Sequence, residues 1–117
     1  MTYEPGCLFC RIAAEEEPAD VVHATDHIVA FRDTTPRAPV HILLIPRQHI
    51  ASVRSLRERH GEMLADLFVS AAHVARAEGI DRSGWRLVTN TGPAAGQTIR
   101  HLHFHLLGGR PMGWPPG

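Results

Sequence analysis

This sequence has no long apolar run, no excess charge of one sign and only two cysteines. None of its apolar stretches approaches the ~18 residues that a membrane-spanning helix needs, and residues 1–6 lack the charged and apolar regions of a signal peptide. We therefore expect a cytoplasmic protein without a membrane partner. Twelve basic residues balance twelve acidic ones, so the electrostatic footprint of a general nucleic-acid binder is missing as well.

The remaining composition is that of an ordinary soluble globular protein, with 44% hydrophobic and 21% charged residues. A chain of 117 residues is long enough for one hydrophobic core, and we expect residues 1–117 to form a single domain. Nine histidines are the one abnormal count. The two cysteines, Cys7 and Cys10, form a Cys-x-x-Cys pair, which in the cytoplasm indicates redox chemistry or metal binding rather than a structural disulfide.

Three of the histidines lie in residues 100–107, where they alternate with large apolar residues. Alternation with a period of two predicts a β-strand with one buried face. Leu102, Phe104 and Leu106 would pack inward, while His101, His103 and His105 would form a row on the opposite face. Imidazoles are not core-building groups, so we expect this row to line a site.

Hydrophobic periodicity predicts the other elements and an α+β fold with a mostly antiparallel sheet. A short helix is expected over residues 7–16, ended by Pro18, and a long amphipathic helix over residues 55–78, ended by Gly79. The most apolar run predicts a central strand covered on both faces, and the position of His41 within it favours a role in the site. The expected strands are residues 20–24, 28–32, 40–45, 85–89 and 100–107.

The loop of residues 91–98 leads into the histidine row and is rich in small residues. A glycine-rich loop lets main-chain N–H groups approach an anion, and Asn90, Gln97 and Thr98 add polar groups for phosphate oxygens. Histidines facing such a loop suit phosphoryl or nucleotidyl transfer, in which an imidazole forms a phosphorus–nitrogen bond that water later cleaves.

A metal site is the main alternative. One tetrahedral ion is strained by three imidazoles in a straight row, because its bonds to nitrogen are only ~2.1 Å long. A more favourable set combines Cys7 and Cys10 with two histidines from elsewhere, for which His49 and His101 are the candidates. Two cysteines and two histidines form a closed set, typical of structural zinc.

The stretch His101-Leu102-His103-Phe104-His105-Leu106-Leu107 resembles the signature of the histidine-triad (HIT) superfamily. Residues 96–98 before it, and residues 108–110 and 114–117 behind it, are similar to the Hint branch of purine nucleoside phosphoramidases. The resemblance extends from about Cys7 to the last residue. It implies a HIT-like fold, with a five-stranded antiparallel sheet, a long helix and a short N-terminal helix.

The resemblance also implies roles for individual residues. His103 would attack the α-phosphorus of a purine nucleoside 5′-phosphoramidate, and His105 would hold the phosphate. His41 would orient the histidines, and Thr98 would lie near the leaving group. Asp33 would bind the ribose hydroxyls. The resemblance further implies a phosphate loop of Asn90, Gly96, Gln97 and Thr98, and a purine pocket of Leu8, Phe9, Ile12, Phe31 and Thr34.

Some zinc-binding bacterial members of this family use a cysteine pair and two histidines, which match Cys7, Cys10, His49 and His101. The resemblance implies a homodimer, with the tail of residues 108–117 near the partner's active site. Trp114 would then influence selectivity for the leaving group, although Gly113 stands where the Hint tail commonly has histidine. Two alternatives stay open: a dinucleoside polyphosphate hydrolase of the same superfamily, and a zinc-binding nucleotide-sensing interaction protein.

Overall fold

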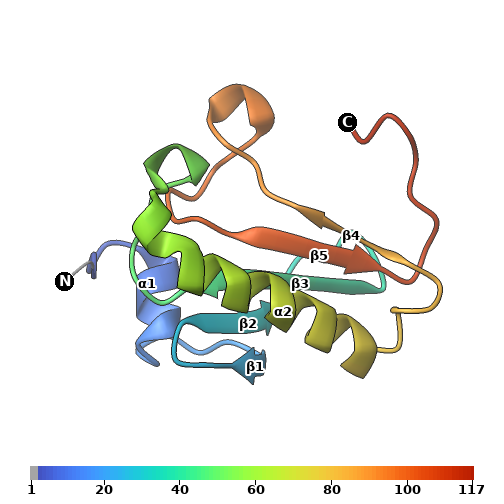
Figure 1. Ribbon diagram of the computed structural model, residues 1–117, viewed down its shortest axis with the longest axis horizontal. Coiled ribbons are helices and arrows are strands. Elements are labelled where there is room, and N and C mark those ends of the chain that lie inside the picture. The colour runs from blue at the N-terminus through green and yellow to red at the C-terminus, as the bar shows by residue number, and fades with distance from the viewer. Residues whose placement is uncertain (1–2) are drawn as a thin grey trace.

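The computed structural model describes residues 3–117 and shows an α+β fold built on one antiparallel sheet (Figure 1). The order of the five strands across the sheet is β1-β2-β3-β5-β4, and every neighbouring pair is antiparallel. This confirms the predicted fold class. The strands are β1 (Val21–Ala24), β2 (Ile28–Arg32), β3 (Val40–Pro46), β4 (Trp85–Val88) and β5 (Phe104–Gly108).

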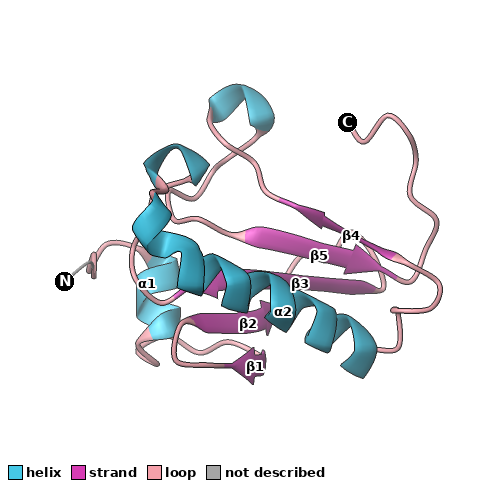
Figure 2. Cartoon of the chain, viewed as in Figure 1, coloured by secondary structure: helices cyan, strands magenta, loops and turns pink. Residues whose placement is uncertain are grey.

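The long helix α2 (Gly61–Ala77) lies across one face of the sheet, and the short helix α1 (Leu8–Ala13) packs on the other (Figure 2). Alternate residues of β3 point to opposite faces of the sheet: Ile42 and Leu44 pack with α2, whereas Leu43 and Ile45 pack with α1. The predicted central strand with two covered faces is therefore confirmed. Strand β3 divides the apolar interior into two clusters, one beneath each helix.

Both helices are shorter than their sequence patterns predict. Helix α1 ends at Ala13 because Glu15 adopts a left-handed conformation (φ 62°), so that the N–H groups of Glu15 and Glu16 reach back to the carbonyls of Ile12 and Arg11. This Schellman closure stops the helix before Pro18 does. Helix α2 begins only at Gly61, after two single 3₁₀ turns at Val53–Ser55 and Glu58–His60. It ends beside Gly79 (φ 76°), as predicted.

The histidine strand also starts later than expected. The ladder between β3 and β5 reaches only as far as the Leu44–Phe104 pair, so residues 101–103 precede the sheet. The predicted alternation persists even so, because Leu102, Phe104 and Leu106 are all buried in the cluster beneath α2.

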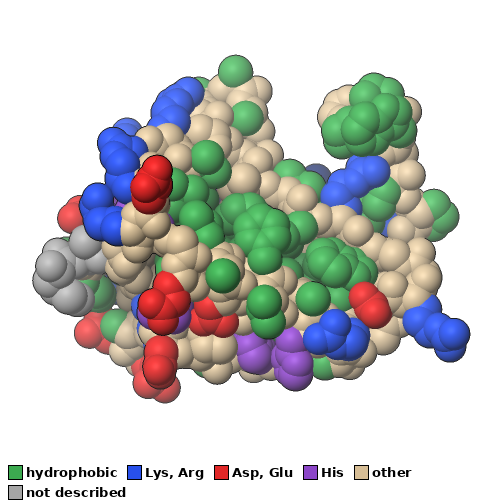
Figure 3. Space-filling view, viewed as in Figure 1, with side chains coloured by type: hydrophobic (Ala, Val, Ile, Leu, Met, Phe, Trp, Pro, Cys, Tyr) green, Lys and Arg blue, Asp and Glu red, His purple; other side chains and the backbone are tan. Residues whose placement is uncertain are grey.

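Helix α2 also exposes apolar side chains to solvent. Phe68 and Val69 are 53% and 66% exposed, and apolar groups gather over and beside this helix in Figure 3. No helix within residues 3–117 combines the length and the apolar character that crossing a membrane requires.

Candidate functional site

The three histidines of the predicted row have different environments. His101 is fully buried (0% exposed), His103 is 8% exposed and His105 is half-buried. The rings of His103 and His105 are neighbours, with centroids 5.2 Å apart, and Phe9 of α1 presents its ring to His103 at 5.1 Å. The site therefore lies on the α1 side of the sheet.

One ring nitrogen of His103 forms a hydrogen bond with the main chain. Its Nδ1 atom lies 2.7 Å from the carbonyl oxygen of His101. A carbonyl only accepts hydrogen bonds, so Nδ1 must carry the proton of the neutral ring. The lone pair then resides on Nε2, which is the arrangement that a nucleophilic imidazole needs.

His105 belongs to a chain of hydrogen bonds that begins at a main-chain amide. The N–H of Arg37 donates to His41 Nδ1 at 3.0 Å, which places the proton of neutral His41 on Nε2. That atom lies 2.9 Å from His105 Nδ1 and 3.4 Å from Asp33 Oδ2. His105 Nδ1 therefore accepts, and His105 Nε2 carries a proton that can be donated to an anion.

Burial keeps these two imidazoles neutral. It lowers the pKa of His41, against the opposing effect of the Asp33 carboxylate. Burial, and after it the neighbouring rings of His103 and His41, lower the pKa of His105 to about 4. At neutral pH the pair therefore acts through directed N–H groups rather than through positive charge.

A cavity of about 590 Å³ lies between α1 and the sheet. All six residues predicted to bind the nucleoside line it: Leu8, Phe9, Ile12, Phe31, Asp33 and Thr34. Asp33 also lines a second cavity of about 340 Å³, together with His41, Asn90 and His105. Asp33 is thus shared by the cavity beside α1 and the cavity of His105.

Gln97 has a different environment from the one expected of a phosphate ligand. Its side-chain oxygen accepts from the N–H of Gly92 at 3.0 Å, and its amide nitrogen donates to the carbonyls of Ala51 and Ile99 at 2.8 and 3.0 Å. Both amide hydrogens are used, so a bond from this side chain to phosphate would have to replace one of these contacts. In this structure Gln97 braces the loop, which turns at Gly96 with φ 90°.

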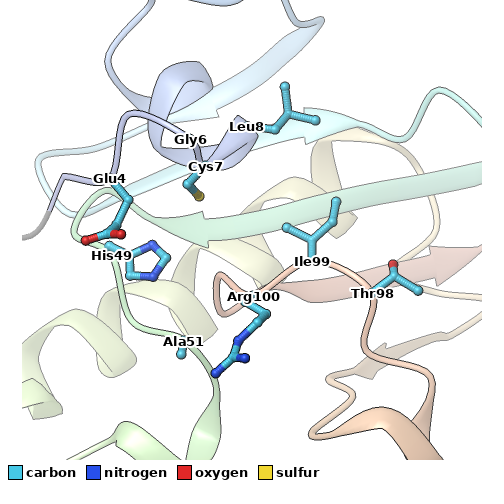
Figure 4. A pocket seen from close by; sticks show the side chains of 9 residues that line it. All are labelled: Glu4, Gly6, Cys7, Leu8, His49, Ala51, Thr98, Ile99 and Arg100. Atoms are coloured by element: carbon cyan, nitrogen blue, oxygen red, sulfur yellow. The ribbon is translucent and has the colours of Figure 1, made fainter.

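Two other predicted residues do not line the cavity of His105. Thr98 is exposed and lines a cavity of about 610 Å³ that also includes His49 and Arg100, not the cavity of His105 (Figure 4). Trp114 is 83% exposed and lines none of these three cavities.

The four predicted metal ligands meet in one cluster. The ligand atoms of Cys7, Cys10, His49 and His101 all lie within 4.8 Å of one another. Cys7 Sγ is 3.3 Å from His101 Nδ1, and Cys10 Sγ is 3.4 Å from His49 Nδ1 and 3.5 Å from His101 Nδ1. Sulfur and nitrogen ligands of a tetrahedral zinc ion are about 3.6 Å apart, so this group could hold a metal ion.

The surroundings of the cluster favour that use. His101 Nε2 lies 2.9 Å from the carbonyl oxygen of Pro46, so it carries the proton and leaves the lone pair of Nδ1 directed at the two sulfurs. Burial lowers the pKa of His101 to about 4, which keeps its ring neutral and able to bind a metal ion. Burial also raises the pKa of the Cys10 thiol, so Cys10 would have to lose a proton when a metal ion binds. Neither cysteine is in a disulfide.

Asp33, His41 and His105 form a second group compact enough for a metal ion. In this structure their facing atoms already share a hydrogen bond between His41 Nε2 and His105 Nδ1, which a metal ion would have to break. We therefore interpret this group as a proton-orienting chain.

Sequence reasoning missed several contributors to the site. Among them, Leu43 and Ile99 line the cavity between α1 and the sheet, and the main-chain amide of Arg37 orients His41. Strand alternation could have identified Leu43, because it pairs with Phe31 on one side and with His105 on the other. No side-chain pattern could have revealed the amide of Arg37, because every residue except proline has that group.

Comparison with known proteins agrees with this geometry. The family model for the HIT domain matches residues 14–112. The chain belongs to the HIT family. A HIT family hydrolase from Legionella pneumophila superposes on it with a TM-score of 0.94 and 48% sequence identity, over 96% of this chain and 100% of the other.

Two curated members of the HIT family have informative names. The purine nucleoside phosphoramidase of Escherichia coli K12 is 43% identical over 106 residues, which are 91% of this chain and 89% of that protein. The 14 kDa zinc-binding protein of Brassica juncea is 46% identical over 112 residues, which are 94% of this chain and 98% of that protein. The predicted family membership is thus confirmed.

Proposed function

We propose that this HIT protein hydrolyses purine nucleoside 5′-phosphoramidates through a nucleotidyl-histidine intermediate. The observation that carries the proposal is the bond from His103 Nδ1 to the carbonyl of His101. It leaves His103 Nε2 with a lone pair, beside a half-buried N–H donor on His105. The E. coli relative named purine nucleoside phosphoramidase supports this choice of substrate.

In the first step, His103 Nε2 attacks the α-phosphorus, and the bond from phosphorus to the amine breaks as the departing nitrogen takes up a proton from solvent. The His103 ring becomes positively charged when its second nitrogen bonds to phosphorus. The carbonyl of His101, which already accepts the Nδ1 proton at 2.7 Å, stabilises that charge. His105 Nε2–H donates to a phosphoryl oxygen and stabilises the negative charge that develops there.

In the second step, water attacks phosphorus, the phosphorus–nitrogen bond to His103 breaks, and the nucleoside monophosphate leaves. One proton is released to solvent, and the neutral His103 ring is restored. Positioning and fixed hydrogen-bond donors supply most of the rate in such transfers.

The nucleoside would occupy the cavity between α1 and the sheet. Its apolar wall suits a purine ring, with Phe9 and Phe31 already in edge-to-face contact at 5.5 Å. Asp33 also lines the cavity of His105. Its Oδ1 atom accepts one bond, from the N–H of Thr35 at 2.8 Å, so its carboxylate keeps acceptor capacity for the two ribose hydroxyls.

We further propose that Cys7, Cys10, His49 and His101 hold a structural zinc ion. The spacing of their ligand atoms supports this, as does the relative named as a zinc-binding protein. A closed set of four ligands leaves no position for substrate, and zinc would supply rigidity rather than a reaction step. Zinc analysis of protein purified without chelator tests the proposal, and a content far below one ion per chain would reject it.

A homodimer is the assembly that we propose. β4 is an edge strand, and a second copy could pair with it and extend the sheet. The exposed Phe68 and Val69 of α2 and the exposed Trp114 of the tail are apolar groups that a partner could cover. Light scattering at micromolar concentration would reject the dimer if it returned the monomer mass.

Two substrates and one variant test the activity. The wild type should release AMP from adenosine 5′-phosphoramidate faster than from diadenosine polyphosphate, and His103→Ala should abolish this release. Faster cleavage of the diadenosine compound would favour the dinucleoside polyphosphate hydrolases instead. Unchanged turnover by His103→Ala would refute the mechanism.

A matched control is available in His27, which lines none of the three cavities and whose side chain is 42% exposed and 3.6 Å from Glu62. His27→Ala removes an imidazole from the surface and should leave turnover unchanged. It therefore separates the specific effect of His103 from a general effect of removing histidine.

A further inference from the structure

His101 contacts both the metal-ligand cluster and the proposed nucleophile. The Nδ1 atom of its ring faces Cys7 and Cys10 at 3.3 and 3.5 Å, and Nε2 is held by the carbonyl of Pro46 at 2.9 Å. Its own carbonyl holds His103 Nδ1 at 2.7 Å. One fully buried residue thus connects two sites that the proposed function treats separately.

The main chain around His101 depends on these contacts for its orientation. Residues 101–103 precede the ladder of β5, so regular strand pairing does not hold the carbonyl of His101. The next residue, Leu102, donates its N–H to the carbonyl of Ile50 at 2.6 Å. Pro46 and Ile50 flank His49, which is itself a member of the cluster. A metal ion bound by both His49 and His101 would therefore add a third connection between His101 and the segment from Pro46 to Ile50.

We infer that His101 is a positioning residue for the nucleophile, and that metal ligation of its ring fixes the carbonyl that keeps the proton of His103 on Nδ1. The inference rests on the proposed role of His103 as the nucleophile. When the ring is not ligated, the carbonyl of His101 is held less firmly, and His103 also populates the tautomer with its proton on Nε2. That tautomer has no lone pair directed at phosphorus.

The substitution Cys7→Ser tests this inference with little disturbance of the fold. Cys7 is the N-cap of α1, and its sulfur accepts the N–H of Cys10 at 3.3 Å. Serine is a favoured N-cap residue, so the start of the helix is kept while a thiolate ligand is lost. Zinc-loaded wild type, chelator-treated wild type and Cys7→Ser are then compared at one pH.

Two measurements report on His103 itself. Imidazole ¹⁵N NMR should show the Nδ1–H tautomer in zinc-loaded protein and a mixture of tautomers in the other two forms. Rapid-quench measurement at saturating adenosine 5′-phosphoramidate should show nucleotidyl-histidine forming at least about tenfold more slowly in those two forms. Saturating substrate removes any loss of nucleoside affinity from the comparison.

Arg11→Ala provides the control for α1. Arg11 belongs to this helix, and its guanidinium bonds Glu17 and the carbonyl of Pro5, but it is not one of the four ligands and lines neither the nucleoside cavity nor the cavity of His105. This variant loosens the same helix without removing a ligand, and it should leave the His103 tautomer and the rate at saturation unchanged. A rate at saturation that fell as far as in Cys7→Ser, with the His103 tautomer unchanged, would overturn the inference, because loosening of α1 alone would then explain the loss.

The inference is also overturned if chelated protein and Cys7→Ser keep the Nδ1–H tautomer and form the intermediate at the rate of zinc-loaded wild type. Circular dichroism establishes which forms are folded, and if chelation unfolds the wild type, the Cys7→Ser comparison decides. Failure of the proposed function looks different, because zinc-loaded wild type would then form no intermediate on His103.

Discussion

His41 Nε2 lies 2.9 Å from His105 Nδ1, and this contact determines which nitrogen of His105 can face a substrate. The proton on His41 is fixed in turn by the amide of Arg37, which donates to His41 Nδ1. The direction of the hydrogen bond between His41 and His105 thus follows from one main-chain N–H group. Hydrogen bonds directed in this way need no rearrangement during the reaction.

Replacement of His41 by phenylalanine tests this orientation. The aromatic ring fills the buried space but offers no N–H to His105, so His105 loses the partner that keeps its proton on Nε2. We expect kcat to fall roughly 10- to 100-fold with a smaller change in KM, because the contact acts on phosphate charge that develops in the transition state. Steady-state kinetics with adenosine 5′-phosphoramidate measures the effect, and an unchanged kcat would show that His41 does not orient His105.

The protonation of His105 predicts an acid-sensitive fold. Its pKa is about 4 in the folded protein and about 6.5 in the unfolded chain. Between these values the unfolded state binds more protons than the folded state. The free energy of unfolding therefore rises as pH increases from about 4 to about 6.5, and this contribution to stability is lost as pH falls through the same window. The difference corresponds to about 3 kcal/mol at most.

Urea unfolding of wild type and His105→Gln across that range measures this contribution. The variant should show a shallower dependence of stability on pH, because glutamine does not titrate. Parallel curves would mean that His105 titrates alike in the folded and unfolded states.

Asp33→Asn tests the predicted contact with ribose. The substitution keeps an oxygen that can accept the N–H of Thr35 but removes the negative charge and half of the acceptor capacity. We expect KM for the ribonucleotide substrate to rise about tenfold, as for loss of a hydrogen bond to a charged group. The 2′,3′-dideoxy analogue serves as the control, since it should be affected far less. An equal loss for both substrates would place the ribose elsewhere.

Gln97→Glu separates bracing of the loop from binding of phosphate. Glutamate keeps the acceptor for the N–H of Gly92 but cannot donate to the carbonyls of Ala51 and Ile99. If Gln97 braces the loop, stability of the free protein should fall by about 1–3 kcal/mol, because buried polar groups lose their partners. Thermal unfolding without ligand checks this. Unchanged stability with weaker AMP binding would instead assign Gln97 to the phosphate.

Several features could be predicted from the residues alone because they depend on side-chain periodicity. Alternation over residues 100–107 identified Leu102, Phe104 and Leu106 as core residues, and the structure buries all three. The apolar run around Leu43 identified a central strand covered on both sides, and it packs against both clusters. The spacing of apolar groups in the long helix predicted its existence and its end at Gly79, although not its beginning.

The sequence by itself determined the fold class, the family and the grouping of cysteines and histidines, because the types of side chain and their spacing along the chain indicate each of these features. Only the tertiary structure divided the histidines among different partners. The carbonyls of His101 and Pro46 and the amide of Arg37 assign the ring nitrogens of His103, His101 and His41. Main-chain groups are the same at nearly every position, so their pairing is decided by how distant segments meet in space, and sequence patterns do not record it.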